Sequence, residues 1–314
     1  MQALGMTMTA PPDSSKSLAM DCHAEALPGR SPITLAEPRL LSLPVVLASP
    51  HSGRHYAPEF LALVEVPEGE LRRAEDAFVD RLFAAAPGLG VPLLAAEFPR
   101  SMVDVNREAL ELDPEMFDGA LPAEANTRSP RVAAGLGAIP RLSAGGRPLY
   151  RRPLPVADAL ASIDRFWRPY HRALAGLVDA AQARFGVALL IDCHSMPSAG
   201  GVGDTAGGET LADIVLGDAF GQSCDPRFVE RAETYLAGHG YAVVRNTPYA
   251  GGFTTRHYGR PAEGIHALQI EISRALYLDE ARIEPIAAFA AVSRDLLGLV
   301  EALGQASLEI RGPR

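Results

Sequence analysis

Two histidines follow apolar runs, and that placement could give them a chemical role. His51 comes shortly after residues 45–47, and His194 comes shortly after residues 187–191. Both runs are short and apolar throughout, as the buried strands of α/β proteins are. Ligands of open α/β sheets bind beyond the carboxyl ends of the strands. We therefore expect both imidazoles to emerge at strand ends and to face one cleft.

Two imidazoles and one carboxylate around an open position are a common way of holding a catalytic zinc ion. His51 and His194 are the two candidate nitrogen ligands. For the carboxylate we favour Asp76, which we expect in the first turn of the helix after the His51 loop. Glu75 and Asp80 are alternatives that spacing alone does not separate from it.

Two further acidic residues lie on expected strands. Asp192 precedes His194 by two residues on the same side of a strand, so it could orient one nitrogen of that ring. Glu271 belongs to an apolar strand over 267–272, where an unpaired carboxylate would be costly, and it shares a face with Gln269. We interpret Glu271 as a general base that takes a proton from a metal-activated water.

Arginines in turns and loops could bind a substrate carboxylate, because a guanidinium group pairs with a carboxylate through two hydrogen bonds. Arg100 could equally form a surface ion pair, so Arg107 and Arg256 are the stronger candidates. The expected substrate-binding residues are Arg100, Asn106, Arg107, Thr254 and Arg256. His257, in the same loop as Thr254, could donate to a developing oxyanion.

Composition indicates a globular protein without a nucleic-acid partner. Of the 314 residues, 47% are hydrophobic and 21% are charged, close to the soluble average. The net charge is −9, and no basic run exceeds two residues, so the footprint of a phosphate-backbone binder is missing.

Cysteine spacing and hydropathy indicate the cellular compartment in which the protein is expected. The three cysteines are far apart and form no CxxC pair, which argues against a disulfide framework and a thiolate zinc site. No apolar stretch approaches about 18 residues, and the first residues do not have the pattern of a secretory signal. We expect a cytoplasmic protein that does not associate with membranes.

Strand and helix patterns alternate along the chain, which indicates the α/β class. We expect one domain over 31–314 after a disordered extension over 1–30. Besides the strands named above, the patterns predict strands at 91–94, 102–105 and 242–244, and helices at 74–86, 156–185, 227–237 and 279–303. The segment 108–153 is dense in Pro, Gly and Arg and is expected to form a loop or cap over a pocket, with a glycine-rich flap at 200–208.

Six blocks, in this order, resemble the N-formylglutamate amidohydrolases. They are SPHSG at 49–53, VDVNR at 103–107, DCHS at 192–195, GD at 217–218 with Cys224, PYAGGFTTRHYG at 248–259 and QIEI at 269–272. The resemblance extends over residues 44 to 300, and six ordered blocks are far more specific than any one of them. One departure is Ser273, where many relatives are expected to carry asparagine.

The resemblance implies a three-layer α/β/α fold with a mostly parallel or mixed central sheet, zinc-exopeptidase-like (phosphorylase/hydrolase-like). It also implies metal-dependent hydrolysis of N-formyl-L-glutamate to formate and L-glutamate in histidine degradation. On this reading His51 and His194 bind Zn²⁺, Glu271 is the catalytic glutamate, and the arginines bind the carboxylates of the substrate.

Several alternatives stay open at this stage. The substrate could be another N-acyl acidic amino acid or a small peptide-like amide, and the protein could be a catalytically inactive relative that only binds ligand. A His/His/carboxylate set also suits Co²⁺, Mn²⁺ or Fe²⁺. The oligomeric state is not indicated by the sequence.

Overall fold

A seven-stranded sheet, in the order β1-β3-β2-β6-β9-β7-β8, forms the centre of the protein. The computed structural model describes residues 31–198 and 212–310. The strands are β1 (Ile33–Ala36), β2 (Val45–Ser49), β3 (Leu93–Ala96), β6 (Ala188–Met196), β7 (Ile214–Gly217), β8 (Val243–Arg245) and β9 (Ile265–Ser273). The strands β3, β2, β6 and β9 run parallel, whereas β1 and β7 run antiparallel to their neighbours β3 and β9. The sheet is therefore mixed and mostly parallel, as predicted.

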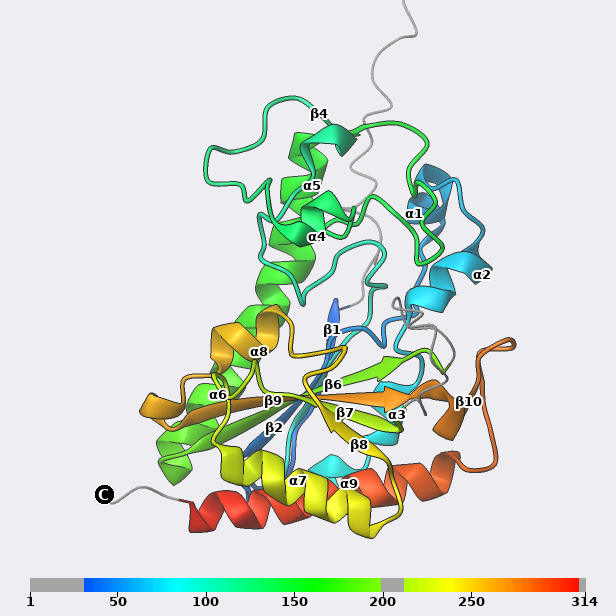
Figure 1. Ribbon diagram of the computed structural model, residues 1–314. Helices are drawn as coiled ribbons and strands as arrows, with labels where there is room; N and C mark the ends of the chain where they lie inside the picture. The colour runs from blue at the N-terminus through cyan, green and yellow to red at the C-terminus, as the bar shows by residue number, and fades with distance from the viewer. Residues whose placement is uncertain (1–30, 199–211, 311–314) are drawn as a thin grey trace, which may run out of the picture.

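Helices cover both faces of this sheet (Figure 1). The helices α6 (Arg168–Phe185) and α8 (Phe253–Tyr258) pack on one face. The other face is covered by α3 (Val79–Leu82), α7 (Pro226–Gly238) and α9 (Phe289–Glu309). The three layers confirm the predicted α/β/α architecture.

Each face of the sheet has its own apolar core, because successive side chains of a strand point to opposite sides. In β2, Val45 and Leu47 belong to the core beneath α9, whereas Val46 and Ala48 belong to the core beneath α6. All five residues of β2 are buried. Burial on both sides explains why this strand reads as an unbroken apolar run rather than an alternating one.

The segment 108–153 and the residues that follow it form a small subdomain above the sheet (Figure 1). It contains η3 (Pro114–Met116), β4 (Phe117–Asp118) and α4 (Pro130–Ala133), and β4 pairs with β5 (Leu154–Pro155). Its buried apolar residues form a separate cluster of Leu112, Met116, Phe117, Ala138, Ile139, Leu154, Ala159 and Ile163. The segment is thus an ordered cap with its own core.

Side chains tie this cap to the rest of the chain. The Ser143 hydroxyl and Arg147 Nη1 donate to the two carboxylate oxygens of Glu70, at 2.6 and 2.8 Å. Glu70 lies on α2 (Glu68–Leu71), which follows α1 (Pro58–Leu63). These contacts hold the cap beside the edge of the sheet where β2 and β6 end.

Some predicted helices are confirmed with small changes. The helix predicted over 156–185 is continuous, as α5 (Val156–Ser162), a π-helical turn η4 (Ile163–Trp167) and α6. It ends where Gly186 adopts the left-handed conformation, with φ 77°. The helix predicted over 227–237 corresponds to α7.

The helix predicted over 74–86 is wrong. The chain forms only η1 (Arg72–Ala74), the four-residue α3 and η2 (Ala86–Leu89), with Phe78 in the left-handed region at φ 63°. Some backbone groups between η1 and α3 bond to distant parts of the chain, where a continuous helix would bond them to one another. Asp76 N donates to His51 O at 3.0 Å, and Ala77 O accepts from the Tyr277 hydroxyl at 2.9 Å. Asp76 therefore lies in an irregular segment rather than in the first turn of a helix.

Two further element predictions are also wrong. Residues 102–105 form turns rather than a strand, because Met102 N bonds to Pro99 O and Asp104 N bonds to Ala138 O of the cap. The last helix begins at Phe289 rather than near Asp279. Before it, β10 (Leu278–Asp279) pairs with β11 (Glu284–Pro285).

The second histidine lies inside a strand rather than after it. β6 extends five residues beyond the predicted end at 191, to Met196, and so contains His194. The predicted flap at 200–208 and the predicted extension at 1–30 lie outside the described residues. Within residues 31–198 and 212–310, no helix is both long enough and apolar enough to cross a membrane.

Candidate active site

The His51 loop follows β2 directly and contacts the segment that carries Asp76. The Ser49 and Ser52 hydroxyls hydrogen-bond to each other, and Ser52 Oγ accepts the Asp80 N–H at 3.1 Å. A Cβ atom at Gly53 would lie 2.0 Å from Phe98 O, so only glycine allows the two backbones to approach this closely. These contacts hold His51 at the carboxyl end of β2.

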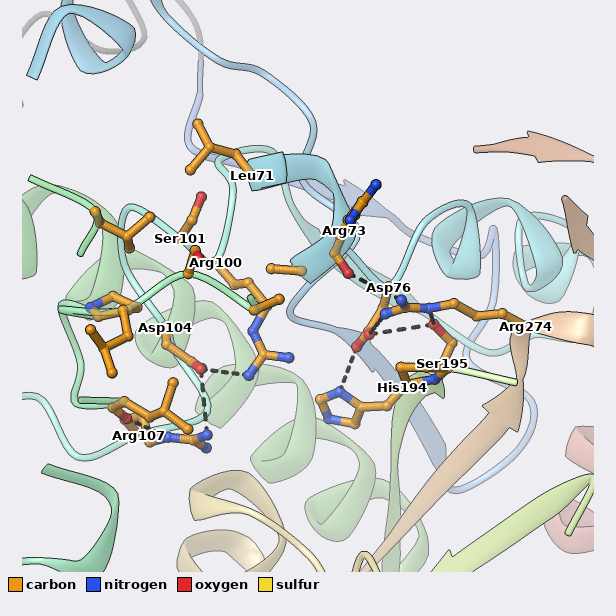
Figure 2. A pocket seen from close by; sticks show the side chains of 18 of the residues that line it. Leu71, Arg73, Asp76, Arg100, Ser101, Asp104, Arg107, His194, Ser195 and Arg274 are labelled. Carbon is orange, nitrogen blue, oxygen red and sulfur yellow. Dashed lines mark hydrogen bonds and ion pairs between the residues drawn. The ribbon is translucent and has the colours of Figure 1, made fainter. Parts of the chain in front are cut away.

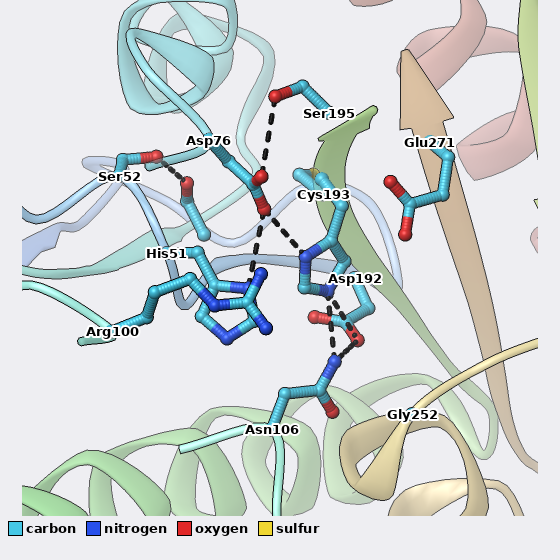
Figure 3. Close-up of polar contacts among 12 residues, drawn as sticks. His51, Ser52, Asp76, Arg100, Asn106, Asp192, Cys193, Ser195, Gly252 and Glu271 are labelled. Carbon is cyan, nitrogen blue, oxygen red and sulfur yellow. Dashed lines mark hydrogen bonds and ion pairs between the residues drawn. The ribbon is translucent and has the colours of Figure 1, made fainter. Parts of the chain in front are cut away.

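His51, Asp76 and His194 converge at this edge of the sheet, with one ligand atom from each within 4.8 Å of the others. Asp76 Oδ2 lies 2.9 Å from His194 Nδ1 and 3.3 Å from His51 Nδ1. All three residues are buried. Figure 3 shows the Asp76 carboxylate facing His51. The structure thus brings together the three residues that the sequence analysis favoured as metal ligands.

The other nitrogen of each imidazole contacts a second carboxylate. His51 Nε2 lies 2.7 Å from Asp104 Oδ1, and His194 Nε2 lies 3.0 Å from Asp192 Oδ2. Carboxylates of this kind fix the tautomer and the ring orientation of metal-binding histidines. Asp192 is therefore positioned to orient His194, and Asp104 has the same relation to His51.

The buried donors fit a divalent cation. His51 Nδ1 is buried and has no hydrogen-bond partner among the described residues, although it lies near Asp76. With Nε2 donating to Asp104, this atom presents a lone pair toward Asp76 Oδ2, as a metal ligand would. Burial by itself would raise the pKa of Asp76, but the His194 and His51 imidazoles lower it below its usual value. The carboxylate is therefore held in its ionised, metal-binding form.

The two alternative carboxylates have other partners. Glu75 accepts hydrogen bonds from the Tyr56 hydroxyl at 2.9 Å and from Arg72 Nε at 3.1 Å. Asp80 accepts two hydrogen bonds from Arg54, at 3.1 and 3.0 Å. Neither belongs to the group of three residues whose ligand atoms converge.

Glu271 lies on β9 opposite His194, its register partner on β6. Its side chain points from β9 toward the strand that carries Asp192 (Figure 3). Gln269 Nε2 donates to Glu271 Oε1 at 2.8 Å, which confirms that these two side chains share a face. Burial raises the pKa of Glu271 to about 7, since the lowering by His194 is opposed by the nearby Asp76. A carboxyl group with this pKa can accept and return a proton near neutral pH.

Two arginines surround Asp104. Arg100 Nη2 donates to Asp104 Oδ2 at 2.7 Å, and Arg107 Nη2 lies 3.7 Å from the same oxygen. Burial alone would raise the pKa of Asp104, but Arg100 and Arg107 hold this pKa well below its usual value. Asp104, which orients His51, is therefore ionised.

Two cavities lie beside the three converging residues, and both are lined by His194 and Glu271. One has a volume of about 220 Å³, and Figure 2 shows Asp76, Arg100, Arg107 and His194 in its lining. Glu271 and apolar cap residues such as Leu136 and Leu142 also line it. The second has a volume of about 290 Å³ and is more polar. Its lining includes His51, His194, Gln269, Glu271 and the arginines Arg100, Arg107, Arg131 and Arg256. The site can therefore take a ligand that carries negative charge.

The predicted substrate-binding residues lie at different distances from these cavities. Arg100, Arg107 and Arg256 line the polar cavity, and so does Asn106. Asn106 Nδ2 lies 3.1 Å from His194 Nε2, while its Oδ1 accepts the Thr254 N–H at 2.8 Å. Thr254 is buried and does not line either cavity, so its contact with the site runs through Asn106.

The structure does not bring His257 to the site. Its side chain is exposed, and its ring stacks on Phe253 with the centroids 4.7 Å apart. It lines neither of the two cavities. Thr254, Thr255 and Tyr258 of α8 are buried, whereas His257 lies on the exposed side of this short helix.

Arg274 and Tyr249 are among the site residues that were not predicted. Arg274, just after β9, donates to Glu75 O at 2.6 Å, to Arg73 O at 3.1 Å and to Ser195 Oγ at 3.2 Å, so it holds the irregular segment that carries Asp76. Tyr249 lines both cavities. A charged residue directly after a strand as apolar as β9 was the available signal for Arg274.

Comparisons with known proteins identify the family to which this chain is similar. Residues 43–278 match the family model described as N-formylglutamate amidohydrolase. N-formylglutamate deformylase from Pseudomonas aeruginosa is 35% identical over 272 residues, which cover 84% of this chain and 94% of the relative. The protein of that name from Pseudomonas putida is 33% identical over 242 residues, covering 76% of this chain and 83% of the relative.

Solved structures extend the likeness to the fold. The crystal structure of N-formylglutamate amidohydrolase from Ralstonia eutropha superposes with a TM-score of 0.83 at 39% identity, covering 90% of this chain and 99% of that one. A gene product of Agrobacterium tumefaciens superposes with a TM-score of 0.58 at 18% identity, covering 89% of this chain and 96% of that one, which is a likeness of fold alone.

Proposed function

This chain belongs to the N-formylglutamate amidohydrolase family, whose characterised relatives are amide hydrolases, and on that basis we propose that it hydrolyses N-formyl-L-glutamate to formate and L-glutamate. One observation supports the reaction most directly. The buried group His51, Asp76 and His194 lies beside Glu271, in a cavity lined by arginines. This combination suits the hydrolysis of an amide in an acidic substrate by a metal-activated water.

In this proposal the site holds Zn²⁺ or another divalent cation through His51 Nδ1, His194 Nδ1 and Asp76 Oδ2. Such an ion, when bound, lowers the pKa of water and polarises a carbonyl oxygen. The protein supplies the orientation of the ligands, because Asp104 and Asp192 contact the outer nitrogens of the two rings. The ligand pattern also suits Co²⁺, Mn²⁺ and Fe²⁺.

Glu271 is the proton-transfer group of the proposal. Its carboxylate takes a proton from the attacking water and then gives that proton to the departing nitrogen of glutamate. The pKa of about 7 that burial gives this group suits both steps near neutral pH. Gln269, which donates to Oε1, holds the carboxyl group in one orientation.

The arginines of the polar cavity bind the substrate. Arg107 is buried and lines both cavities, so it is suited to the carboxylate nearest the scissile amide. Arg100 keeps Asp104 ionised and adds positive charge to the same region. The reaction would be a late step of histidine degradation and would take place in the cytoplasm.

The test is formate release from N-formyl-L-glutamate by the purified protein, before and after dialysis against a chelator and again after addition of Zn²⁺. We expect activity that is lost on dialysis and restored by the metal. Formate release that survives complete metal removal would exclude the metal mechanism. No release with Zn²⁺, Co²⁺, Mn²⁺ or Fe²⁺ would exclude the substrate, and N-formyl-L-aspartate and N-acetyl-L-glutamate would then be tried.

A further inference from the structure

The substrate proposed above has two carboxylates, and the arginines of the polar cavity differ in how far protein partners engage them. Arg107 donates from Nε to Leu136 O at 3.1 Å and from Nη1 to Asn106 O at 2.8 Å. Arg100 is paired with Asp104. By contrast, the side chains of Arg131 and Arg256 make no hydrogen bond or ion pair with any residue in 31–198 or 212–310.

Arg131 comes from the cap and Arg256 from α8, and they meet around the same space. Both line the polar cavity of about 290 Å³, and both line an adjoining cavity of about 310 Å³. The first of these cavities also contains His51, His194 and Glu271. A ligand held at the proposed metal site can therefore extend toward the guanidinium groups of Arg131 and Arg256.

The local structure holds Arg131 in place. Ser129 caps α4 by accepting the Val132 N–H at 3.0 Å, and its hydroxyl donates to Glu111. After the helix, Leu136 N donates to Arg131 O at 2.8 Å, and Leu136 O accepts from Arg107 Nε. Hydrogen bonds to Leu136 thus connect the backbone of Arg131 with the side chain of Arg107.

Positive charge is in excess here, because four arginines but a single carboxylate, that of Glu271, belong to the lining of the polar cavity. Burial, together with repulsion from Arg131 and Arg100, lowers the pKa of Arg107 to about 10, even though Asp104 opposes the change. The two acidic residues of the adjoining cavity have other partners. Glu108 accepts from Asn126 Nδ2 at 3.1 Å, and Glu111 accepts from Ser129. An anionic group of the ligand would reduce this repulsion and would satisfy the free donors.

We propose that Arg131 and Arg256 bind the side-chain carboxylate of the substrate, and that Arg131 makes the enzyme prefer an acidic side chain to a neutral one of the same shape. Arg107 then receives the other carboxylate. The inference rests on the proposed function, because it assigns a role in the same site. It gives the cap a direct part in substrate choice.

The experiment compares N-formyl-L-glutamate with N-formyl-L-glutamine, which has the same shape without the side-chain charge. In Arg131→Met we expect kcat/KM for the glutamate substrate to fall about 10- to 100-fold, the effect of losing hydrogen bonds to a charged group. The change should lie mainly in KM, since this contact is with a part of the substrate whose bonds do not change in the reaction. The value for the glutamine substrate should change by less than about 3-fold, and Arg131→Lys should recover part of the loss.

Arg128→Met is the matched control, because Arg128 is an exposed arginine of the same cap that lines neither cavity. It should leave both kcat/KM values unchanged. Equal losses for the two substrates in Arg131→Met, or no loss for either, would overturn the proposal. Thermal unfolding of each variant would show whether an equal loss comes from a damaged cap.

A binding measurement keeps this test separate from catalysis. Calorimetric titration of the same two compounds is carried out in a Glu271→Gln background, with and without Arg131→Met. Arg131→Met should remove most of the preference for N-formyl-L-glutamate, and an unchanged preference would overturn the assignment of Arg131. If the wild-type protein releases no formate, the proposed function fails, whereas the calorimetric comparison still decides the role of Arg131.

Discussion

At position 271, replacing one carboxylate oxygen with an amide nitrogen separates proton transfer from the binding of metal and substrate. Glu271→Gln keeps the shape of the side chain but removes its basicity. We expect turnover of N-formyl-L-glutamate to fall by about 10²- to 10⁴-fold, the usual contribution of a general acid–base group, with metal content unchanged. Formate release and metal analysis of the purified variant check this. As a control, Glu263→Gln changes an exposed side chain and should behave like the wild type. Full activity in Glu271→Gln would mean that another group moves the proton.

Asp192 acts on the metal site through His194, so its replacement should weaken metal binding without removing a ligand. For Asp192→Asn we expect metal affinity to fall about 10- to 100-fold, because the carboxylate that lies 3.0 Å from His194 Nε2 is lost. Competition with a chromophoric chelator measures the dissociation constant. Asp80→Asn is the control, since Asp80 pairs with Arg54 and should leave metal affinity unaltered. A large effect of Asp80→Asn would revive Asp80 as a candidate ligand.

Between η1 and α3 the chain has no regular structure, and the element that follows β9 holds it. η6 (Arg274–Leu276) and Tyr277 donate to the carbonyls of Arg73, Glu75 and Ala77. Arg274 also lies 3.4 Å from Asp76 Oδ1. One short element therefore positions the carboxylate of the proposed metal site.

Removing this clamp should destabilise the metal-free protein. For Arg274→Met we expect the free energy of unfolding to fall by about 3 kcal/mol, because a buried carboxylate loses its cationic neighbour and three carbonyl or hydroxyl groups lose a donor. Urea unfolding in the presence of a chelator measures the change. Arg282→Met removes an exposed ion pair with Glu284 and should change stability by less than about 0.5 kcal/mol. A similar small change in Arg274→Met would show that the segment keeps its conformation without the clamp.

The same segment shows which elements could be predicted from the sequence. Strands β2 and β9 were predictable because each is a short apolar run between turn residues, and α6 because its apolar spacing ends at Gly186. Residues 74–86 have helical spacing too, but Arg274 and Tyr277 take up the backbone groups that a helix would use. Those partners lie about 200 positions away along the chain, and a local pattern carries no information about them.

At the scale of the whole molecule, the site is an assembly of distant segments on one sheet edge. The two histidines could be predicted because parallel strands end at a common edge. The contact of Asp104 with His51 could not be predicted, and neither could the proximity of Arg131 and Arg256. Both depend on how the cap folds over the edge of the sheet. The placement of His257 on the exposed side of α8 depends in the same way on how that helix packs against the sheet.

His171 joins three parts of the molecule in one apolar cluster. It lies on α6, its Nε2 donates to Val105 O at 2.7 Å, and its ring contacts Phe253 of α8 with the centroids 5.3 Å apart. Burial lowers the pKa of this imidazole to about 4, although the bond to Val105 opposes the shift. In the unfolded chain the pKa of a histidine is about 6.5.

This difference makes the stability of the whole fold depend on pH. Between pH 6.5 and 4 the unfolded chain binds a proton that folded His171 does not, so the free energy of unfolding falls as the pH falls. Between pH 7.5 and pH 5, His171 lowers the free energy of unfolding by about 2 kcal/mol. Above pH 7 its effect on the free energy of unfolding is close to zero. His171→Gln should therefore reduce the loss of stability between these two pH values by about 2 kcal/mol relative to the wild type, as measured by urea unfolding.

The control is Tyr170→Phe, at the neighbouring position. This change removes a buried hydroxyl that has no hydrogen-bond partner among the described residues, and it should leave the pH dependence unchanged. If His171→Gln shows the wild-type dependence, acid destabilisation arises at other groups, and the junction of α6 and α8 tolerates the charged imidazole.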